Sequence, residues 1–348
     1  MDILTQGVVG AALPLATRQK KQAAAAAALG FLAGLAPDFD ALIRSSEDPL
    51  MFLEFHRHFT HSLFFIPVGS AVVAGVLYGL GRRWLGLSIW KCWFFCALGF
   101  GTHGLLDAAT SFGTSLLWPL SDTRFSLSII SIFDPLFTLP LIALVGAGVV
   151  KRDGRYGRAA LIWSALYLSA AGYQHLQAHR MAKTLAESRG HEGVRLVVKP
   201  TFGNILLWRS IYAVDGRFYV DGVLPWPRRR LFEGTSIATL KPTRDFPWLQ
   251  PGSRQARDIM RFTRLSDGFV AKALDGSPRV IDVRYSFLPT ETTPLWFIRL
   301  TPNGPPGTRV VYATDRSAAS EKQAKEAIAV PQRRRRRLQQ PGCSGRYK

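Results

Sequence analysis

The chain has 348 residues, 47% of them hydrophobic, and a formal net charge of +20. This length allows two domains. Three cysteines are too few for a disulfide framework, and the sequence contains neither a phosphate-binding glycine motif nor the signature of a nucleic-acid-binding module, so we expect no specific nucleic-acid partner.

Apolar residues are concentrated in the first 180 positions. A helix needs about 20 predominantly apolar residues to cross the hydrocarbon core of a bilayer. Four segments meet this requirement, namely residues 61–81, 89–108, 128–150 and 159–178. The shorter, alanine-rich stretch at 22–36 is either a fifth span or a half-buried helix. Residues 1–180 are therefore predicted to form a polytopic α-helical membrane domain with about four to five spans.

The positions of Lys and Arg in the short loops predict how this domain is oriented. The basic loops are "RQKK" at 18–21, "GRRW" at 81–84 and "KRDGRYGR" at 151–158. Short basic loops stay in the cytoplasm, so the opposite ends of the spans are expected to meet at the outer face. The positions at those ends are Ala36, His61, His103, Ser128 and His179.

The pattern changes from about residue 181. Short segments such as "VRLVVKP" and "GRFYVDG" alternate with Gly, Pro, Asp and Asn, which is typical of strands and hairpins. Residues 181–316 are predicted to be a smaller, β-rich soluble domain. The net charge of residues 181–348 is +16, but a large domain is translocated largely regardless of its charge, so we expect this domain on the periplasmic side.

The end of the chain has a different composition. The last 18 residues begin with PQRRRRR and carry seven positive charges and no acidic residue. Residues 317–348 are predicted to be a disordered basic tail, with attraction to anionic lipid or nucleic acid as the less favoured alternative.

Three groups of acidic and histidine residues lie at the predicted outer ends. "LAPDFDALI" contains Asp38 and Asp40, "GTHGLLDAAT" contains His103 and Asp107, and "HRHFTHS" contains three histidines at 56, 58 and 61. In a helix, the i and i+4 positions of "HGLLD" place both side chains on one face. Asp and His together favour zinc or manganese over calcium, which prefers oxygen ligands alone.

Each group also has a simpler interpretation. A histidine near a membrane boundary is often an interfacial residue, Asp38 and Asp40 could cap the following turn, and His103 with Asp107 could be a buried hydrogen-bonded pair. Convergence of all three groups at one face favours a metal site, because ionisable groups at membrane depth are costly and usually functional.

The same segments resemble a known family. "MDILTQGVVGAA", "GLAPDFD", "HRHFTHSLF", "THGLLDAATSFGTSLLWPLSDTRFSL" and "IFDP" are similar to the YdjM-type membrane-bound metal-dependent hydrolases. The resemblance covers residues 1 to about 145 and implies a bacterial inner-membrane protein. The ligand set that it implies is Asp38, Asp40, His56, His61, His103 and Asp107. His58 stands where the family usually has Gly, and Gln6 stands where some relatives have His.

The resemblance and the residue types together predict hydrolysis of a phosphoester. An Asp/His cluster can hold two or more divalent ions, which activate water and stabilise an in-line displacement at phosphorus. Arg57 and Arg124 are the candidate phosphate contacts, with lipid-headgroup binding as the alternative. Thr60, Ser62 and Thr110 are expected to orient the ligands.

Two function classes follow from this sequence. The first is an inner-membrane hydrolase that uses zinc or manganese on a lipid or lipid-linked substrate from the outer leaflet. The second is a non-enzymatic membrane scaffold or binding protein in which the metal ties helices together while the β-rich domain engages a partner. A transporter is less favoured, because the polar residues gather at one end and do not line a path across the bilayer.

Overall fold

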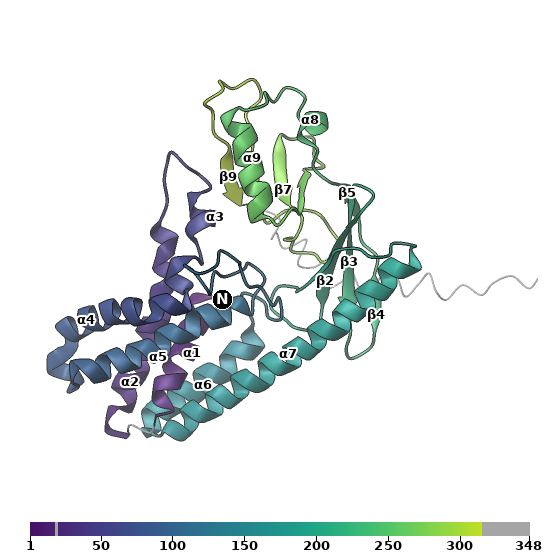
Figure 1. The fold of residues 1–348 in the computed structure, drawn as a ribbon. Helices are drawn as coiled ribbons and strands as arrows, with labels where there is room; N and C mark the ends of the chain where they lie inside the picture. Colours follow the sequence, from purple (N-terminus) through teal and green to yellow (C-terminus); the bar gives the residue numbers. More distant parts are fainter. Residues whose placement is uncertain (18–19, 315–348) are drawn as a thin grey trace, which may run out of the picture.

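The structure is a computed structural model that describes residues 1–17 and 20–314. The predicted basic tail at 317–348 and part of the basic loop at 18–21 lie outside the described residues. The described chain forms a helical region followed by a β-rich region, as predicted (Figure 1).

The helical region is a bundle built around its first helix, α1, which packs against α2, α5, α6 and α7. Its elements are α1 (Ile3–Leu15), η1 (Lys20–Gln22), α2 (Ala23–Leu35), η2 (Ala36–Leu42), α3 (Met51–Phe55), η3 (Phe59–His61), η4 (Leu63–Phe65), α4 (Ile66–Leu85), α5 (Ile89–Ala108), α6 (Pro135–Lys151) and α7 (Gly154–Ser188).

The helix ends follow local signals in the sequence. α5 has the predicted bounds and begins after Ser88, whose hydroxyl accepts a hydrogen bond from the backbone N–H of Lys91. The segment at 128–134, predicted as part of a span, is a loop. Asp134 caps α6, and Pro135 occupies the first helical position.

Three glycines allow close packing of α1, α2 and α5. A Cβ atom added at Gly30 would lie 2.4 Å from the carbonyl oxygen of Gly10, and one added at Gly99 would lie 2.2 Å from the carbonyl oxygen of Gly30. The backbones therefore approach so closely that a larger residue would push the helices apart, as is common in membrane bundles.

Two antiparallel sheets form the β-rich region. The first contains β1 (Leu196–Pro200), β2 (Trp208–Val214), β3 (Arg217–Leu224), β4 (Arg230–Phe232) and β5 (Ser236–Ala238), with β3 paired to β2, β4 and β5. The second has the order β6 (Val270–Lys272), β7 (Arg279–Asp282), β8 (Trp296–Arg299) and β9 (Val311–Thr314). Between the sheets in the chain lie α8 (Pro242–Asp245) and α9 (Arg254–Leu265).

The turn between β2 and β3 in the first sheet follows from its two residues. Asp215 and Gly216 join β2 to β3, and both have positive φ, of 49° and 70°. This conformation at both turn residues matches the twist of the flanking strands, and Asp-Gly favours it.

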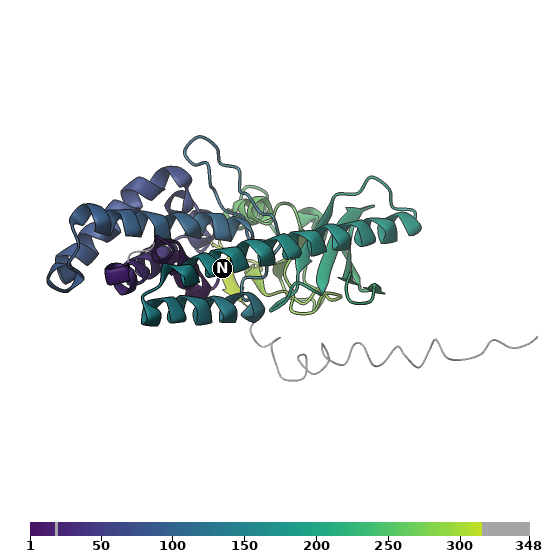
Figure 2. The ribbon, with the colours of Figure 1, turned by 90° about the horizontal axis from the view of Figure 1, so that it is seen from below.

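α7 connects the two regions. It runs from the helix bundle along the β-rich region (Figures 1 and 2), so the predicted boundary at residue 180 falls inside a continuous helix. One hydrophobic cluster includes Tyr167 and Ala178 of α7 together with Trp208 and Val223 of the first sheet. The two regions therefore share a core.

A second contact between the regions involves α3. Leu50 and Leu53 pack in one cluster with Ile259 and Phe262 of α9. Arg261 of α9 lies 3.0 Å from Asp48 and 2.9 Å from Glu54. The segment that leads to the histidine motif is thus held by the β-rich region.

Two helical segments among the described residues, Lys20–Leu42 and Leu63–Gly81, are long and apolar enough to span a membrane by length and composition. α1 and α6 are apolar but shorter. On α4, the side chains of Val68, Val72, Val76 and Leu80 recur every fourth residue and are exposed. They form an apolar stripe of the kind that lipid covers.

Candidate metal centre

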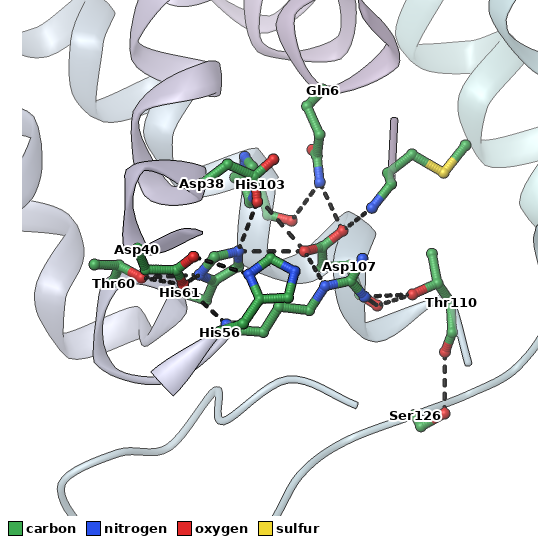
Figure 3. A network of polar contacts seen from close by, with 12 residues as sticks. Gln6, Asp38, Asp40, His56, Thr60, His61, His103, Asp107, Thr110 and Ser126 are labelled. Carbon is green, nitrogen blue, oxygen red and sulfur yellow. Dashed lines mark hydrogen bonds and ion pairs between the residues drawn. The ribbon is translucent and has the colours of Figure 1, made fainter. Parts of the chain in front are cut away.

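All the Asp and His residues of the three sequence groups except His58 meet at one end of the helix bundle (Figure 3). Asp38 and Asp40 lie in η2, His61 is the last residue of η3, and His103 and Asp107 stand one turn apart near the end of α5. Residues far apart in the chain are therefore combined by the packing of helix ends.

Asp38, His61, His103 and Asp107 form the first group, in which the candidate ligand atoms all lie within 4.8 Å of one another. Nε2 of His61 is 3.5 Å from Oδ1 of Asp38 and 3.3 Å from Oδ2 of Asp107. Nε2 of His103 is 3.4 Å and 3.7 Å from the same two oxygens. Two imidazole nitrogens and two carboxylate oxygens thus surround one point.

Hydrogen bonds behind the two rings fix their orientation. Nδ1 of His103 is 2.5 Å from the carbonyl oxygen of Gly34, which can only accept, so Nδ1 carries the hydrogen. Nδ1 of His61 is 3.2 Å from Oδ2 of Asp40 and 3.0 Å from Oγ1 of Thr60. A carbonyl or carboxylate behind a ligating imidazole is common in metal sites, because it directs the Nε2 lone pair toward the ion.

Three buried atoms of this group make no hydrogen bond: Nε2 of His61, Nε2 of His103 and Oδ2 of Asp107, although the last forms an ion pair with Nε of Arg57 at 2.9 Å. Leaving a buried polar atom without a partner costs about 1–3 kcal/mol. When each ring is neutral with its hydrogen on Nδ1, its Nε2 lone pair points at a carboxylate, which repels it. A divalent cation would satisfy all three atoms at once, so this set of nitrogen and oxygen atoms could hold a metal ion.

Asp38, Asp40 and His56 form a second group, which shares Asp38 with the first. Nδ1 of His56 is 2.9 Å from Oδ1 of Asp40. The other oxygen of Asp40 accepts hydrogen bonds from the backbone N–H of Arg57, at 2.8 Å, and from the hydroxyl of Thr60, at 2.9 Å. Among the residues of the two metal groups, Asp38 has the most exposed side chain, at 23%.

Two residues of the N-terminal segment contact Asp107. Gln6 donates a hydrogen bond of 2.8 Å to Oδ1 of Asp107, and the amino group of Met1 forms an ion pair with the same oxygen. Gln6 belongs to neither metal group, so it supports a candidate ligand from behind. Sequence reasoning singled out Gln6 only as a departure from the family pattern and missed Met1; a polar residue within the apolar helix α1 was the available signal for Gln6.

Arg57 is enclosed in the centre. It has a positive φ of 61° and is 4% exposed. Its Nε lies 2.9 Å from Oδ2 of Asp107, and its guanidinium donates to the hydroxyl of Thr110 at 2.7 Å. Thr110 in turn donates to the carbonyl oxygen of Asp107. Arg57 thus balances the charge of a candidate ligand.

Arg124 lies farther out. Its guanidinium donates to the carbonyl oxygens of Leu53 and Glu54, at 3.2 Å and 2.7 Å. Burial lowers the pKa of Arg124, and the nearby positive charge of Arg57 lowers it further. The ring of Phe112 lies beneath both guanidinium groups, 5.4 Å from Arg57 and 6.0 Å from Arg124.

Two further residues of the histidine motif have other contacts. Ser62 donates to the carbonyl oxygen of Trp118 and accepts from the N–H of Phe64, so neither hydrogen bond of its hydroxyl involves a candidate ligand. His58 belongs to neither metal group, and its ring packs against Trp118.

Comparisons with known proteins match the part of the chain that contains the two metal groups. The model of the YdjM inner membrane protein family matches residues 1–178, which include both metal groups. Over 72 residues the chain is 42% identical to inner membrane protein YbcI of Escherichia coli strain K12, covering 20% of this chain and 39% of that protein. Over 188 residues it is 23% identical to the uncharacterized protein YfhP of Bacillus subtilis strain 168, covering 53% of this chain and 54% of that protein.

The chain spans about half, or less, of the length of these curated relatives. No solved structure matches it. The part of the chain after residue 178 is outside the family match.

Proposed function

Because the chain belongs to the YdjM inner membrane protein family, we propose that it is an inner-membrane, metal-dependent hydrolase of a phosphoester. The observation that carries the proposal is the pair of buried Nε2 atoms of His61 and His103, which make no hydrogen bond and both face Oδ1 of Asp38 and Oδ2 of Asp107. A site with two imidazole lone pairs and carboxylates at this spacing fits a divalent ion better than it fits a closed hydrogen-bond network.

The two groups share Asp38, which suits a centre with two ions. Bound divalent ions would supply Lewis acidity and activate water for attack at phosphorus. The protein contributes the orientation of the ligands: Gly34 and Asp40 hold the Nδ1 protons of His103 and His61, and Arg57 balances Asp107. Asp38, the more open ligand, marks the side from which a substrate reaches the centre.

The membrane arrangement is part of the proposal. Four to five spans between residues 1 and 180 would place the metal centre and the β-rich region at the outer face, where a lipid or lipid-linked phosphoester can enter from the outer leaflet. A reporter that is active only outside the cytoplasm should be active when fused after Gly190 and silent within residues 151–158. The reverse result would require a cytoplasmic substrate.

A non-enzymatic scaffold is the second candidate, and the burial of His61, His103 and Asp107 favours it. A structural metal site has every position filled by protein, whereas a catalytic site keeps one position open for water or substrate. A metal-bound structure in which side chains fill all positions would therefore support the scaffold.

The principal experiment measures metal content and activity together. The purified protein should contain about one or two zinc or manganese ions per chain. It should hydrolyse one member of a panel of phospholipid, lipid diphosphate and phosphodiester substrates, and a chelator should stop the reaction. The double variant His103→Ala/Asp107→Ala should lose both metal and activity, whereas the control His179→Ala, on α7 outside both groups, should retain them. Full metal occupancy in the double variant would refute the site.

A further inference from the structure

A cleft of about 770 Å³ opens between the helical region and the β-rich region. Its lining includes Phe55, His58, Ser115 and Arg124 from the helical region, and Lys199 and Arg284 from the β-rich region. One wall therefore comes from residues beyond the family match, which ends at residue 178.

The cleft adjoins the metal centre. Phe112 lines the cleft, and its ring centroid lies 5.5 Å from that of His56 in the second metal group. The backbone N–H of Ser115, another lining residue, donates to the carbonyl oxygen of Arg57 at 3.0 Å. A molecule in the cleft would therefore lie beside the side chains that surround the metal groups.

Lys199 of β1 is the unusual residue of this cleft. It is only 4% exposed, and its Nζ makes no hydrogen bond. Nζ lies 3.4 Å from the centroid of the Tyr285 ring. A buried ammonium without an anion is costly, and a cation–π contact returns only about 2 kcal/mol of that cost. Buried ionisable groups that line a cleft are candidates for functional sites.

Arg124 provides a second cation on the opposite wall. Its hydrogen bonds go to backbone carbonyl oxygens, and no carboxylate among the described residues forms an ion pair with it. The other basic residues of the lining are already paired, Arg284 with Asp282 and Arg264 with Glu54. Arg124 thus offers positive charge from one wall, and Lys199 offers from the other wall an amine that a bound anion would hold in its protonated form.

Two neutral groups of the lining also have unused hydrogen-bonding capacity. Oγ of Ser115 and Nδ1 of His58 are buried and have no partner. The acidic residues of the lining could repel an anion, but each of them is either paired with an arginine or exposed. Glu54 is paired with Arg261, Asp267 is paired with Arg195, and Asp122 is exposed to solvent. The balance of free groups therefore favours an anion with several acceptor oxygens.

We propose that this cleft binds the phosphate group of the substrate, between Arg124 of the helical region and Lys199 of the β-rich region. The identity of the bound molecule as substrate rests on the proposed hydrolase function, but the binding itself does not. A phosphate offers acceptors to several donors at once, and its charge pairs with the ammonium and the guanidinium. The β-rich region then has a direct role at the site, as half of the binding cleft.

The test measures binding of two probes to the full chain in detergent after chelator treatment: inorganic phosphate and short-chain phosphatidic acid. Isothermal titration calorimetry should detect binding of at least one. Lys199→Met and Arg124→Met should each weaken it roughly tenfold or more, as expected for the loss of a charged hydrogen bond. Lys199→Arg, which keeps the cation, should retain most of the affinity. Lys241→Met, an exposed lysine outside the cleft, should have no effect.

The two probes distinguish the source of the phosphate. Binding of phosphatidic acid alone indicates a lipid headgroup, whereas binding of inorganic phosphate indicates that the phosphate suffices without a lipid. Unchanged affinity in Lys199→Met, or no binding of either probe to the wild type, would overturn the proposal.

The metal-deficient double variant His103→Ala/Asp107→Ala separates the two proposals. It should still bind the probe, even if the hydrolase function proves wrong. Loss of binding in that variant, together with normal binding in Lys199→Met, would place the phosphate at the metal centre and refute the cleft.

Discussion

The helical region and the β-rich region bury carboxylates in different ways. In the β-rich region, Asp221 accepts two hydrogen bonds from Arg189, at 2.7 Å and 2.9 Å, and Asp258 accepts one of 2.8 Å from Arg309. In the helical region, Oδ2 of Asp107 is also paired with an arginine, Arg57, at 2.9 Å, but it additionally faces Nε2 of His61 and of His103, which make no hydrogen bond. A carboxylate whose oxygens are taken up by hydrogen-bond donors stabilises a fold, whereas one that shares a point with two imidazole nitrogens lacking a hydrogen bond is suited to a ligand.

The largest expected effect comes from neutralising Asp107 of the metal centre, in comparison with Asp221 of the β-rich region. Asp107→Asn should lose the metal and about 3–5 kcal/mol of unfolding free energy, because it leaves the buried Arg57 without a counter-charge. Asp221→Asn should cost about 1–3 kcal/mol and retain the metal, because Arg189 is 25% exposed and can be hydrated. Metal analysis and denaturant unfolding of both purified variants check this. Equal metal content in the two variants would show that Asp107, which faces the imidazole rings, matters no more for metal binding than Asp221.

An intermediate effect is expected from the packing beneath the metal centre. Gly30→Ala should destabilise the bundle by about 1–3 kcal/mol and reduce metal content, because its Cβ would collide with the carbonyl oxygen of Gly10 and displace α2, which leads to Asp38. Gly75→Ala in α4 is the matched control, since nothing lies within 4 Å of an added Cβ there. It should be neutral or slightly stabilising. A destabilisation as large as that of Gly30→Ala would show that helix propensity, rather than close packing, decides the result.

The smallest expected effect concerns Lys199 of the β-rich region, whose buried Nζ makes no hydrogen bond. Burial lowers its pKa well below the usual value; Arg284 and Arg209 add to this shift, and Asp282 and Asp267 oppose it. At a pH between the pKa values of Lys199 in the folded and the unfolded chain, the unfolded chain holds a proton that the folded chain has released. The free energy of unfolding therefore rises with pH across this range.

Lys199→Met should consequently raise the melting temperature at neutral pH, and the gain should shrink as the pH approaches about 10.4, the ordinary pKa of lysine. Thermal unfolding of both proteins in detergent across this pH range provides the measurement. A variant that melts below the wild type at neutral pH would indicate that Lys199 is structural. Higher stability together with weaker phosphate binding is expected of a residue retained for a ligand.

Much of the helical region could be predicted because its signals are local. The bounds of α5 matched the apolar segment that follows Ser88, since a cap and a run of apolar residues act within one helix. The segment at 128–134 misled the prediction because it is equally apolar. It is a loop whose backbone bonds α1 and the end of α5: Ile132 accepts from the N–H of Asp2, and Ile129 donates to Ala109. Hydropathy reports only how apolar a segment is, so it cannot distinguish an apolar loop from a span.

The sequence by itself determined which residues could bind a metal, because residue type and i, i+4 spacing are chemical facts that do not depend on the rest of the fold. It could not determine which nitrogen of each histidine is free, that Arg57 is enclosed against Asp107, or that Lys199 forms a wall of the same cleft as Arg124. These properties depend on contacts between residues many positions apart, such as Gly34 with His103. Only the packing of α1, α2 and α5, and the docking of the β-rich region along α7, brings those residues together.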